Sequence, residues 1–252
     1  MLKAVIFDMD DTLLNWEARR LDWSEYENNH LRGVFTYLAA AGHPLSDAEA
    51  FVAEAVRRTE EAWASVGEDL RAPHVGDTLI ETAVALGIPR HQLDKQALLR
   101  AYGWTGMPGV HTFPEVPDLI ERLRGHGIKL GIVTNAYAPI WMRDQELRSL
   151  DLEPELFDCR VSSADVGYLK PHPAIFTYAL NCLGVLAEEA IFVGDNLEAD
   201  VVGAQGVGMR AVWRKRPDAA PLVGGMIAPD ATISDLDELP AVLDRYFPGW
   251  QD

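Results

Sequence analysis

The chain has 252 residues, of which 48% are hydrophobic and 24% charged, proportions typical of a globular protein that buries a core of its own. Its net charge of −17 repels nucleic acids and anionic membrane surfaces, and only short basic clusters such as Arg214–Arg216 interrupt the acidity. No apolar stretch is long enough to cross a bilayer. From the charge and from this lack of a spanning segment we expect neither a nucleic acid nor a membrane as a partner.

Short, continuous apolar runs recur along the chain, as in strands that are buried on both faces of a parallel sheet. The runs are 4–7, 129–133, 159–162, 190–193, 209–213 and 231–233. Helical patterns lie between or after them, at 114–125, 139–150, 173–183, 197–204 and 235–246. This alternation predicts a doubly wound α/β fold.

The interval 15–102 breaks the alternation, because its segments are all apolar at helical period. The segments are 16–41, 47–67, 75–86 and 93–102, with glycines and prolines between them. Ser46–Glu49 has the form of a helix-starting capping box, and the glycine-rich stretch 103–111 is typical of a return hinge. We therefore expect an all-helical domain, 15–105, inserted into an α/β core made of 1–14 and 106–252.

Two cysteines, Cys159 and Cys182, lie far apart in the sequence and match no metal-ligand spacing. A reduced pair of small buried residues in an intracellular protein is the simplest interpretation. The apolar run 4–7 is too short, and too soon followed by aspartates, for a signal peptide. We therefore expect a cytoplasmic protein.

The first chemical motif is Asp8-Met9-Asp10-Asp11-Thr12, directly after the first predicted strand, and in open α/β sheets ligands bind at that end of the strands. Alternation places Asp8 and Asp10 on one side, where their repulsion is relieved by a cation or by a retained proton. An aspartate-rich turn that caps a helix has the same composition. An EF-hand is excluded, because Leu13 and Arg19 stand where that loop needs glycine and glutamate.

Two further motifs are weaker on their own. Thr134-Asn135 follows a predicted strand and precedes a helix, a place that suits either a bound anion or an ordinary helix cap. Lys170, before a proline, is either a phosphate ligand or a solvated surface lysine.

The last motif, Gly194-Asp195-Asn196-Leu197-Glu198-Ala199-Asp200, again follows a strand. Asp195 is either a helix cap or a functional acid, and one helical turn brings Asp200 back to the same edge. Together the four motifs supply acids, a hydroxyl, a lysine and more acids in an order that one parallel sheet can bring together.

The order Asp-x-Asp-x-Thr, Thr-Asn, Lys-Pro and Gly-Asp-x-x-x-x-Asp, running from Asp8 to Asp200, resembles the haloacid dehalogenase (HAD) superfamily. The resemblance implies a Rossmann-like parallel sheet and a helical cap that closes over the site, which fits the block 15–105. It also implies a phosphatase that hydrolyses small phosphate monoesters through an aspartyl phosphate. The implied cofactor is Mg²⁺ and the implied partner is a small phosphorylated metabolite, with the oligomeric state left open.

By residue-by-residue match to this family, Asp8 is the nucleophile and Asp10 is the general acid and base. Thr134, Asn135 and Lys170 bind the phosphate. The physics agrees, because a lysine offsets negative charge that gathers on phosphate oxygens, and a carboxylate nucleophile divides one difficult hydrolysis into two steps.

The same match assigns Mg²⁺ to the Asp8 carboxylate, the Asp10 backbone carbonyl and Asp195. Asp200 would orient the lysine or a metal-bound water. Asp11 stands where relatives often have glycine, and we interpret it as a turn residue.

Other functions fit the motifs less well. A 2-haloacid dehalogenase attacks carbon without a metal and typically lacks the second acid, which is present here as Asp10. A phosphomutase stays open as a close relative. A signalling receiver is about half as long and has no helical cap, and an inactive binding module would have lost Asp8, Asp10 or Lys170.

Substrate choice is expected in the cap, where the sequence says least. A phosphoglycolate-like acid, a nucleoside monophosphate and a sugar phosphate all remain open, with tryptophans slightly favouring a ring-bearing substrate. The residues considered as facing the site are Trp16, Arg19, Trp23, Arg57, Arg58 and Trp104.

Overall fold

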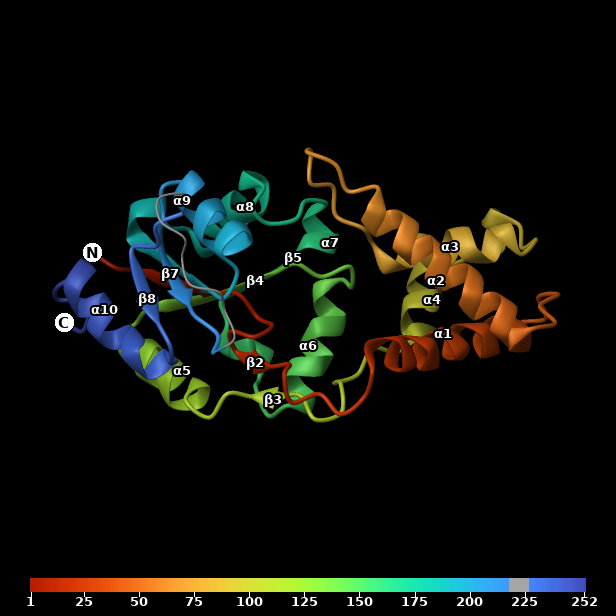
Figure 1. Cartoon of the computed structure of the whole chain (residues 1–252), viewed down its shortest axis with the longest axis horizontal. Coiled ribbons are helices and arrows are strands. Elements are labelled where there is room, and N and C mark those ends of the chain that lie inside the picture. Colours follow the sequence, from red (N-terminus) through yellow and green to blue (C-terminus); the bar gives the residue numbers. More distant parts are fainter. Residues whose placement is uncertain (218–226) are drawn as a thin grey trace.

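The computed structural model describes residues 1–217 and 227–252, in which a parallel sheet covered by helices lies beside a block of helices (Figure 1). The sheet has six strands in the order β5-β4-β1-β6-β7-β8, and all neighbouring pairs are parallel. The strands are β1 Ala4–Phe7, β4 Lys129–Thr134, β5 Cys159–Ser162, β6 Ala190–Gly194, β7 Arg210–Arg214 and β8 Ala231–Ile233. The predicted strands and the α/β class are confirmed.

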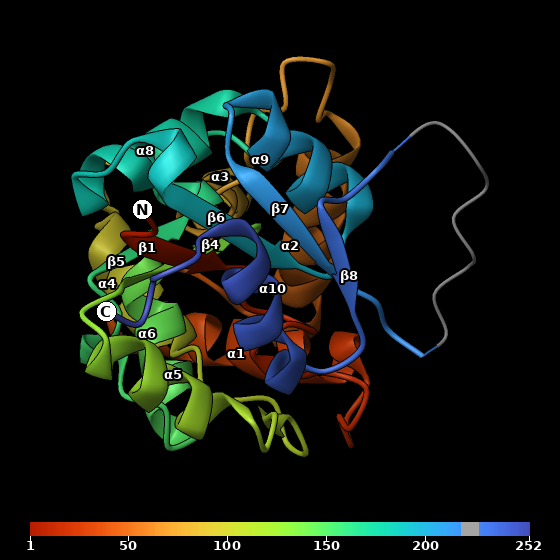
Figure 2. The same cartoon turned by 90° about the vertical axis from the view of Figure 1, so that its left-hand side faces the viewer.

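The residues of β1 alternate between two buried faces of the sheet. Val5 and Phe7 belong to the apolar cluster on one face, and Ala4 and Ile6 to the cluster on the other. Helices cover both faces (Figure 2). One face carries α5 (Val116–Gly125), α6 (Ile140–Ser149) and α10 (Leu239–Tyr246), and the other carries α8 (Pro173–Leu183) and α9 (Gly203–Gly206).

Short helical turns complete this part of the chain. They are η2 Pro154–Leu156, α7 Ser163–Val166, η3 Ala187–Glu189, the π-helix η4 Leu197–Val202 and η5 Leu236–Glu238. The predicted helix 197–204 is therefore a π-helix that continues into α9, and the predicted helix 235–246 consists of η5 and α10. None of the helices in the described ranges is long and apolar enough to cross a membrane.

The helical block is confirmed between β2 and β3. Its helices are α1 Trp23–Ala40, α2 Ala48–Ala64, α3 Val75–Ala85 and α4 Lys95–Tyr102, with a turn η1 at Arg90–Gln92. The first helix begins later than the predicted residue 16, because Asp22 caps it by accepting the backbone N–H of Ser24. Likewise Asp47, and not Ser46, caps α2.

A two-stranded antiparallel ribbon links the block to the sheet. It pairs β2 (Leu14–Asn15) with β3 (His111–Thr112), the two passages of the chain between the parts. Neither strand was predicted from the sequence, since two residues carry no readable period. The division into residues 15–105 and the remainder stays a prediction, because one continuous apolar cluster runs from Phe7 in the sheet to Phe51 in α2.

The expectation of two reduced cysteines is wrong, because Cys159 and Cys182 form a disulfide. β5 and α8 pack together and bring the two Cα atoms to 6.0 Å. The pairing depends on this packing of a strand against a helix, which a separation of 23 residues in the sequence does not reveal.

Candidate active site

Asp8 lies where β1 ends, between β4 and β6. Its backbone N–H donates to Val193 O at 2.8 Å, which continues the pairing of β1 with β6. The side chain is buried, at 6% exposure, and its Oδ2 accepts the Thr12 hydroxyl at 3.5 Å. Thr134 ends the neighbouring strand β4 at the same edge and is also buried. Phosphate binding by Thr134 stays a prediction.

Lys170 is a buried cation between two carboxylates. Its Nζ lies 2.5 Å from Asp8 Oδ1 and 2.7 Å from Asp200 Oδ1. Burial alone would lower the pKa of Lys170, but the charges of Asp200 and Asp8 prevail and raise it above its ordinary value. The ammonium group is therefore charged at neutral pH.

Asn135 fixes the backbone of Lys170. The Lys170 N–H donates to Asn135 Oδ1 at 2.7 Å, and Asn135 Nδ2 donates to Lys170 O at 3.1 Å. These two bonds position the lysine directly after the strand end at Thr134. The predicted contact of Asn135 with phosphate is untested and stays a prediction.

Asp200 approaches the sheet over Gly194, the last residue of β6. A Cβ atom at Gly194 would lie 2.2 Å from Asp200 Oδ2, so that only glycine leaves room for the carboxylate. The same Oδ2 accepts the Asn196 N–H at 2.9 Å. Asp200 is buried, and the π-helix η4 carries it back to the edge where Asp195 lies.

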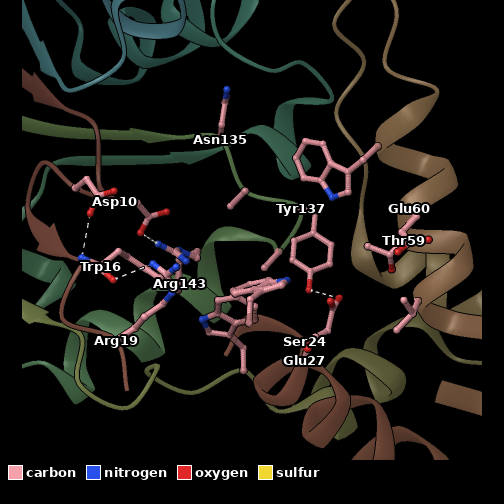
Figure 3. Close-up of a pocket in the computed structure, with 17 residues that line it drawn as sticks. Asp10, Trp16, Arg19, Ser24, Glu27, Thr59, Glu60, Asn135, Tyr137 and Arg143 are labelled. Carbon is pink, nitrogen blue, oxygen red and sulfur yellow. Dashed lines mark hydrogen bonds and ion pairs between the residues drawn. The ribbon is translucent and has the colours of Figure 1, made fainter. Parts of the chain in front are cut away.

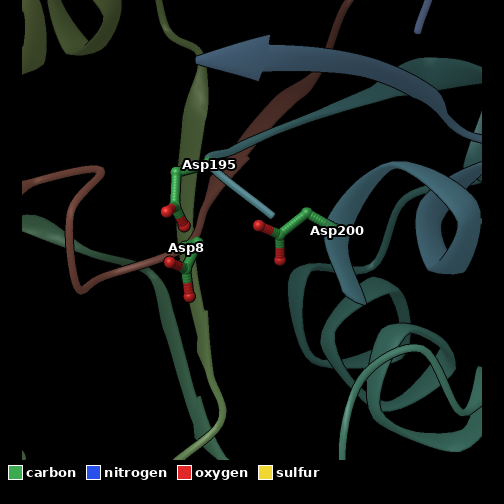
Figure 4. Close-up of side chains that lie close together, drawn as sticks. All are labelled: Asp8, Asp195 and Asp200. Atoms are coloured by element: carbon green, nitrogen blue, oxygen red, sulfur yellow. The ribbon is translucent and has the colours of Figure 1, made fainter. Parts of the chain in front are cut away.

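The carboxylates of Asp8, Asp195 and Asp200 form a cluster in which one oxygen of each lies within 4.8 Å of the others (Figure 4). Burial, followed by the charge of Asp200, raises the pKa of Asp195 to about 6. Burial also raises the pKa of Asp8 well above its ordinary value, although Lys170 opposes this. Hard carboxylate oxygens that are crowded and only partly neutralised suit a divalent cation such as Mg²⁺.

Asp10 lies beside this cluster and forms an ion pair with Arg143 on α6. The Asp10 side chain is 36% exposed, whereas Arg143 is 3% exposed. Arg143 also contacts Glu146 at 2.9 Å, and Glu146 in turn accepts the indole N–H of Trp104 at 2.9 Å. Arg143 was not predicted from the sequence, because one arginine within a predicted helix is indistinguishable from a solvated surface residue.

Asp11 has a left-handed backbone, with φ at 56°, which confirms it as a turn residue. Arg214 donates to its carbonyl at 2.9 Å, and Arg216 forms an ion pair with its carboxylate at 2.8 Å. Arg216 also lies 3.6 Å from Asp195. Arg216 therefore compensates two acids at the site and Arg214 holds the backbone of Asp11, neither of which the sequence predicted.

A cavity of about 810 Å³ opens beside Asp10, between the sheet and the helical block (Figure 3). Four residues considered from the sequence line it, namely Trp16, Arg19, Trp23 and Trp104. Arg57 and Arg58 do not line it, because both form ion pairs with Glu54. The other lining residues are Asp11, Ser24, Glu27, Val56, Thr59, Glu60, Trp63, Asn135, Ala136, Tyr137, Ala138 and Arg143.

Comparison with known proteins gives a consistent result. The sequence profile of the haloacid dehalogenase-like hydrolases matches residues 2–208. A glyceraldehyde 3-phosphate phosphatase of Methanopyrus kandleri is 34% identical over 222 residues, covering 86% of this chain and 85% of that protein. An HAD phosphatase from Thermococcus onnurineus is 28% identical in sequence, and its crystal structure matches with a TM-score of 0.57 over 96% of this chain and 98% of that one. A 2-haloacid dehalogenase from Pseudomonas syringae pv. Tomato DC3000 is 27% identical in sequence, and its crystal structure matches with a TM-score of 0.63 over 98% of this chain and 100% of that one.

Proposed function

The chain belongs to the haloacid dehalogenase-like hydrolases, and we propose that it is a Mg²⁺-dependent phosphatase that hydrolyses small phosphate monoesters. The observation that carries the proposal is the buried contact of Asp8 with Lys170, next to the carboxylates of Asp195 and Asp200. This arrangement combines a nucleophile, a cation for phosphate oxygens and a cluster of oxygen donors.

In the proposed reaction an Asp8 oxygen attacks phosphorus while the bond from phosphorus to the ester oxygen breaks. Lys170 holds negative charge on the phosphate oxygens as the bond forms. The product of this step is a phosphoryl group on Asp8 and a free alcohol. Water then attacks the same phosphorus, which releases inorganic phosphate and restores the carboxylate.

Asp10 moves the protons in both steps. It donates one to the departing alcohol and takes one from the attacking water. The ion pair with Arg143 fixes the Asp10 carboxylate at the mouth of the cavity, where the alcohol lies.

Asp8, Asp195 and the Asp10 carbonyl are the proposed Mg²⁺ ligands, with Asp200 positioned to orient Lys170. When bound, the metal neutralises part of the repulsion between a phosphate dianion and a carboxylate nucleophile.

The test is hydrolysis of a panel of phosphorylated metabolites by the purified chain, first with Mg²⁺ and then with EDTA. We expect turnover that EDTA abolishes. Asp8→Asn should lower kcat by at least about 10⁴-fold, because it removes the nucleophile and leaves Lys170 paired with Asp200. Substantial residual turnover by a folded Asp8→Asn protein would exclude the covalent route.

A 2-haloacid dehalogenase is the competing function, since one such enzyme shares the fold at 27% identity. Asp10 argues against it, because attack on carbon by Asp8 needs no proton donor for a departing halide. Release of chloride from 2-chloropropionate in the presence of EDTA, without phosphate release from any ester, would favour the dehalogenase.

The proposed location is the cytoplasm, as the phosphorylated substrates favour. The disulfide between Cys159 and Cys182 argues against a reducing compartment. Alkylation of free thiols in freshly lysed cells decides between the cytoplasm and an oxidising compartment. A cytoplasmic protein should be labelled at both cysteines.

A further inference from the structure

The cavity beside Asp10 is walled by tryptophans. Four of the seven tryptophans in the chain line it. Trp23 and Trp63 are 38% and 39% exposed, and they are the exposed tryptophans of the described residues. The apolar faces of such large rings gain free energy when a ligand covers them.

The same cavity holds two carboxylates that lack a basic partner. Glu27 and Glu60 form no ion pair among the ion pairs of residues 1–217 and 227–252, whereas Asp10 and Asp11 of the same cavity pair with arginines. Glu27 is only 7% exposed, and its side-chain partners are neutral: the Tyr137 hydroxyl, which donates to it at 2.9 Å, and the side chain of Trp23. Burial raises the pKa of Glu27, as expected for an acid without a compensating charge.

The charges are ordered along the cavity (Figure 3). Asp10, Arg19 and Arg143 lie at one end, and Glu60 on α2 lies at the opposite end. Tyr137 and Glu27 lie between these ends. A phosphate ester bound at Asp8 would therefore direct its alcohol portion past the arginines and toward the tryptophans and the two glutamates.

We infer that the alcohol portion of the substrate carries a cationic nitrogen with methyl or ring carbons attached, held by Trp23 and Trp63 and neutralised by Glu27 and Glu60. Tryptophan faces attract such cations more strongly than other side chains do, and the attraction increases when water is excluded. An acidic alcohol, such as that of phosphoglycolate, would instead meet two uncompensated carboxylates. The inference rests on the proposed phosphatase function for the position of the ester.

Binding of the alcohol alone tests the inference without turnover. The probes are choline and its uncharged carbon isostere, 3,3-dimethylbutan-1-ol, titrated into the whole chain while tryptophan fluorescence is followed. We expect choline to bind about tenfold more tightly, because the tryptophan faces and the two carboxylates both favour the charged probe. Equal affinity, or tighter binding of the neutral alcohol, overturns the inference.

Substitution of the two glutamates tests whether they cause the preference for choline. Glu27→Gln keeps an acceptor for Tyr137, and Glu60→Gln changes an exposed side chain, so at least one of them should fold normally. Each should reduce the preference for choline several-fold, because each removes one negative charge from the cavity. Glu68→Gln is the matched control, an exposed glutamate outside the cavity, and it should keep the full preference. A preference that is unchanged in both cavity variants contradicts the assignment.

Hydrolysis separates this inference from the proposed function. The substrates are phosphocholine and 3,3-dimethylbutyl phosphate, and we expect a higher kcat/KM for phosphocholine. If both esters are hydrolysed at the same rate, the phosphatase proposal stands and the cationic substrate class is wrong. If neither ester nor any member of the metabolite panel is hydrolysed but choline still binds preferentially, the cavity assignment stands and the phosphatase proposal is wrong.

Discussion

Asp195 couples the stability of the protein to pH. Its pKa of about 6 in the folded chain lies above the ordinary aspartate value, so the folded state binds the proton more tightly than the unfolded state between about pH 4 and 6. The free energy of unfolding therefore decreases as pH rises through this window, by roughly 2–3 kcal/mol from this residue. Above about pH 6 the full loss of unfolding free energy from ionised Asp195 is present.

Urea unfolding with EDTA, at pH 4.5 and at pH 7, measures this effect. The decrease between the two pH values should be smaller in Asp195→Asn, which carries no titrating group there. Mg²⁺ should restore stability to the wild type at pH 7, because the ion binds only the folded cluster. Identical pH profiles for the two proteins would mean that Asp195 is not held in a strained, crowded site.

Gly194 is a second residue with a sharp expected effect. In Gly194→Ala the new methyl group would collide with the Asp200 carboxylate, and we expect a loss of about 1–3 kcal/mol together with weaker positioning of Lys170. Gly206→Ala in α9 is the matched control, because no atom lies within 4 Å of its added Cβ, and it should be neutral or stabilising. Thermal unfolding of both variants checks the pair.

Among the elements, α6 joins the site to the chain that returns from the helical block. Arg143 on this helix contacts Asp10 on one side and Glu146 on the other, and Glu146 holds the Trp104 indole. Removing one member of a buried ion pair leaves the other charge uncompensated, at a cost of about 3–5 kcal/mol. The three contacts therefore make α6 a rigid support.

The expected result is that Arg143→Met unfolds at much lower denaturant concentration than the wild type. The double variant Arg143→Met/Glu146→Leu should recover most of that stability, since both charges are then gone. Both variants should keep a kcat below that of the wild type, because Asp10 has lost its partner Arg143 in both. If the double variant is no more stable than the single one, the pair is not what supports this helix.

At the scale of the whole molecule, the helical block and the sheet share one apolar cluster. We therefore expect both to unfold in one transition, with tryptophan fluorescence and far-ultraviolet circular dichroism giving the same midpoint in urea. The fluorescence reports mainly the cavity between the parts, and the dichroism reports all helices. Two separated transitions would instead support two independent domains, divided near residues 15 and 105.

The sequence predicted the sheet well because β1, β4 and β6 are local apolar runs, and local patterns need no knowledge of the fold. It also predicted that the four motifs gather, because parallel strands end at one edge of a sheet. Asp8, Lys170 and Asp200 are in direct contact, as that reasoning requires. The roles of these residues in catalysis stay predictions.

What the sequence could not give depends on packing between distant segments. Arg143 reaches Asp10 across 133 positions, and Arg216 reaches Asp11 across 205. Charged side chains of this kind have no period and no fixed spacing, so nothing distinguishes them from solvated surface residues. The disulfide could not be predicted because it depends on the packing of β5 against α8, and the ribbon of β2 with β3 because strands of two residues carry no period.

Tyr137 connects the two parts of the molecule, because its backbone follows β4 and its hydroxyl contacts two helices of the helical block. It meets the Tyr102 hydroxyl at 2.7 Å at the end of α4 and donates to Glu27 on α1, while its own backbone follows Thr134-Asn135 by two residues. Any movement of the helices away from the sheet must break these hydrogen bonds and expose the buried side chains of Glu27, Tyr102 and Tyr137 to water. We therefore expect that any motion that widens the cavity beside Asp10 exposes this junction at Tyr137, which lies two residues after Asn135.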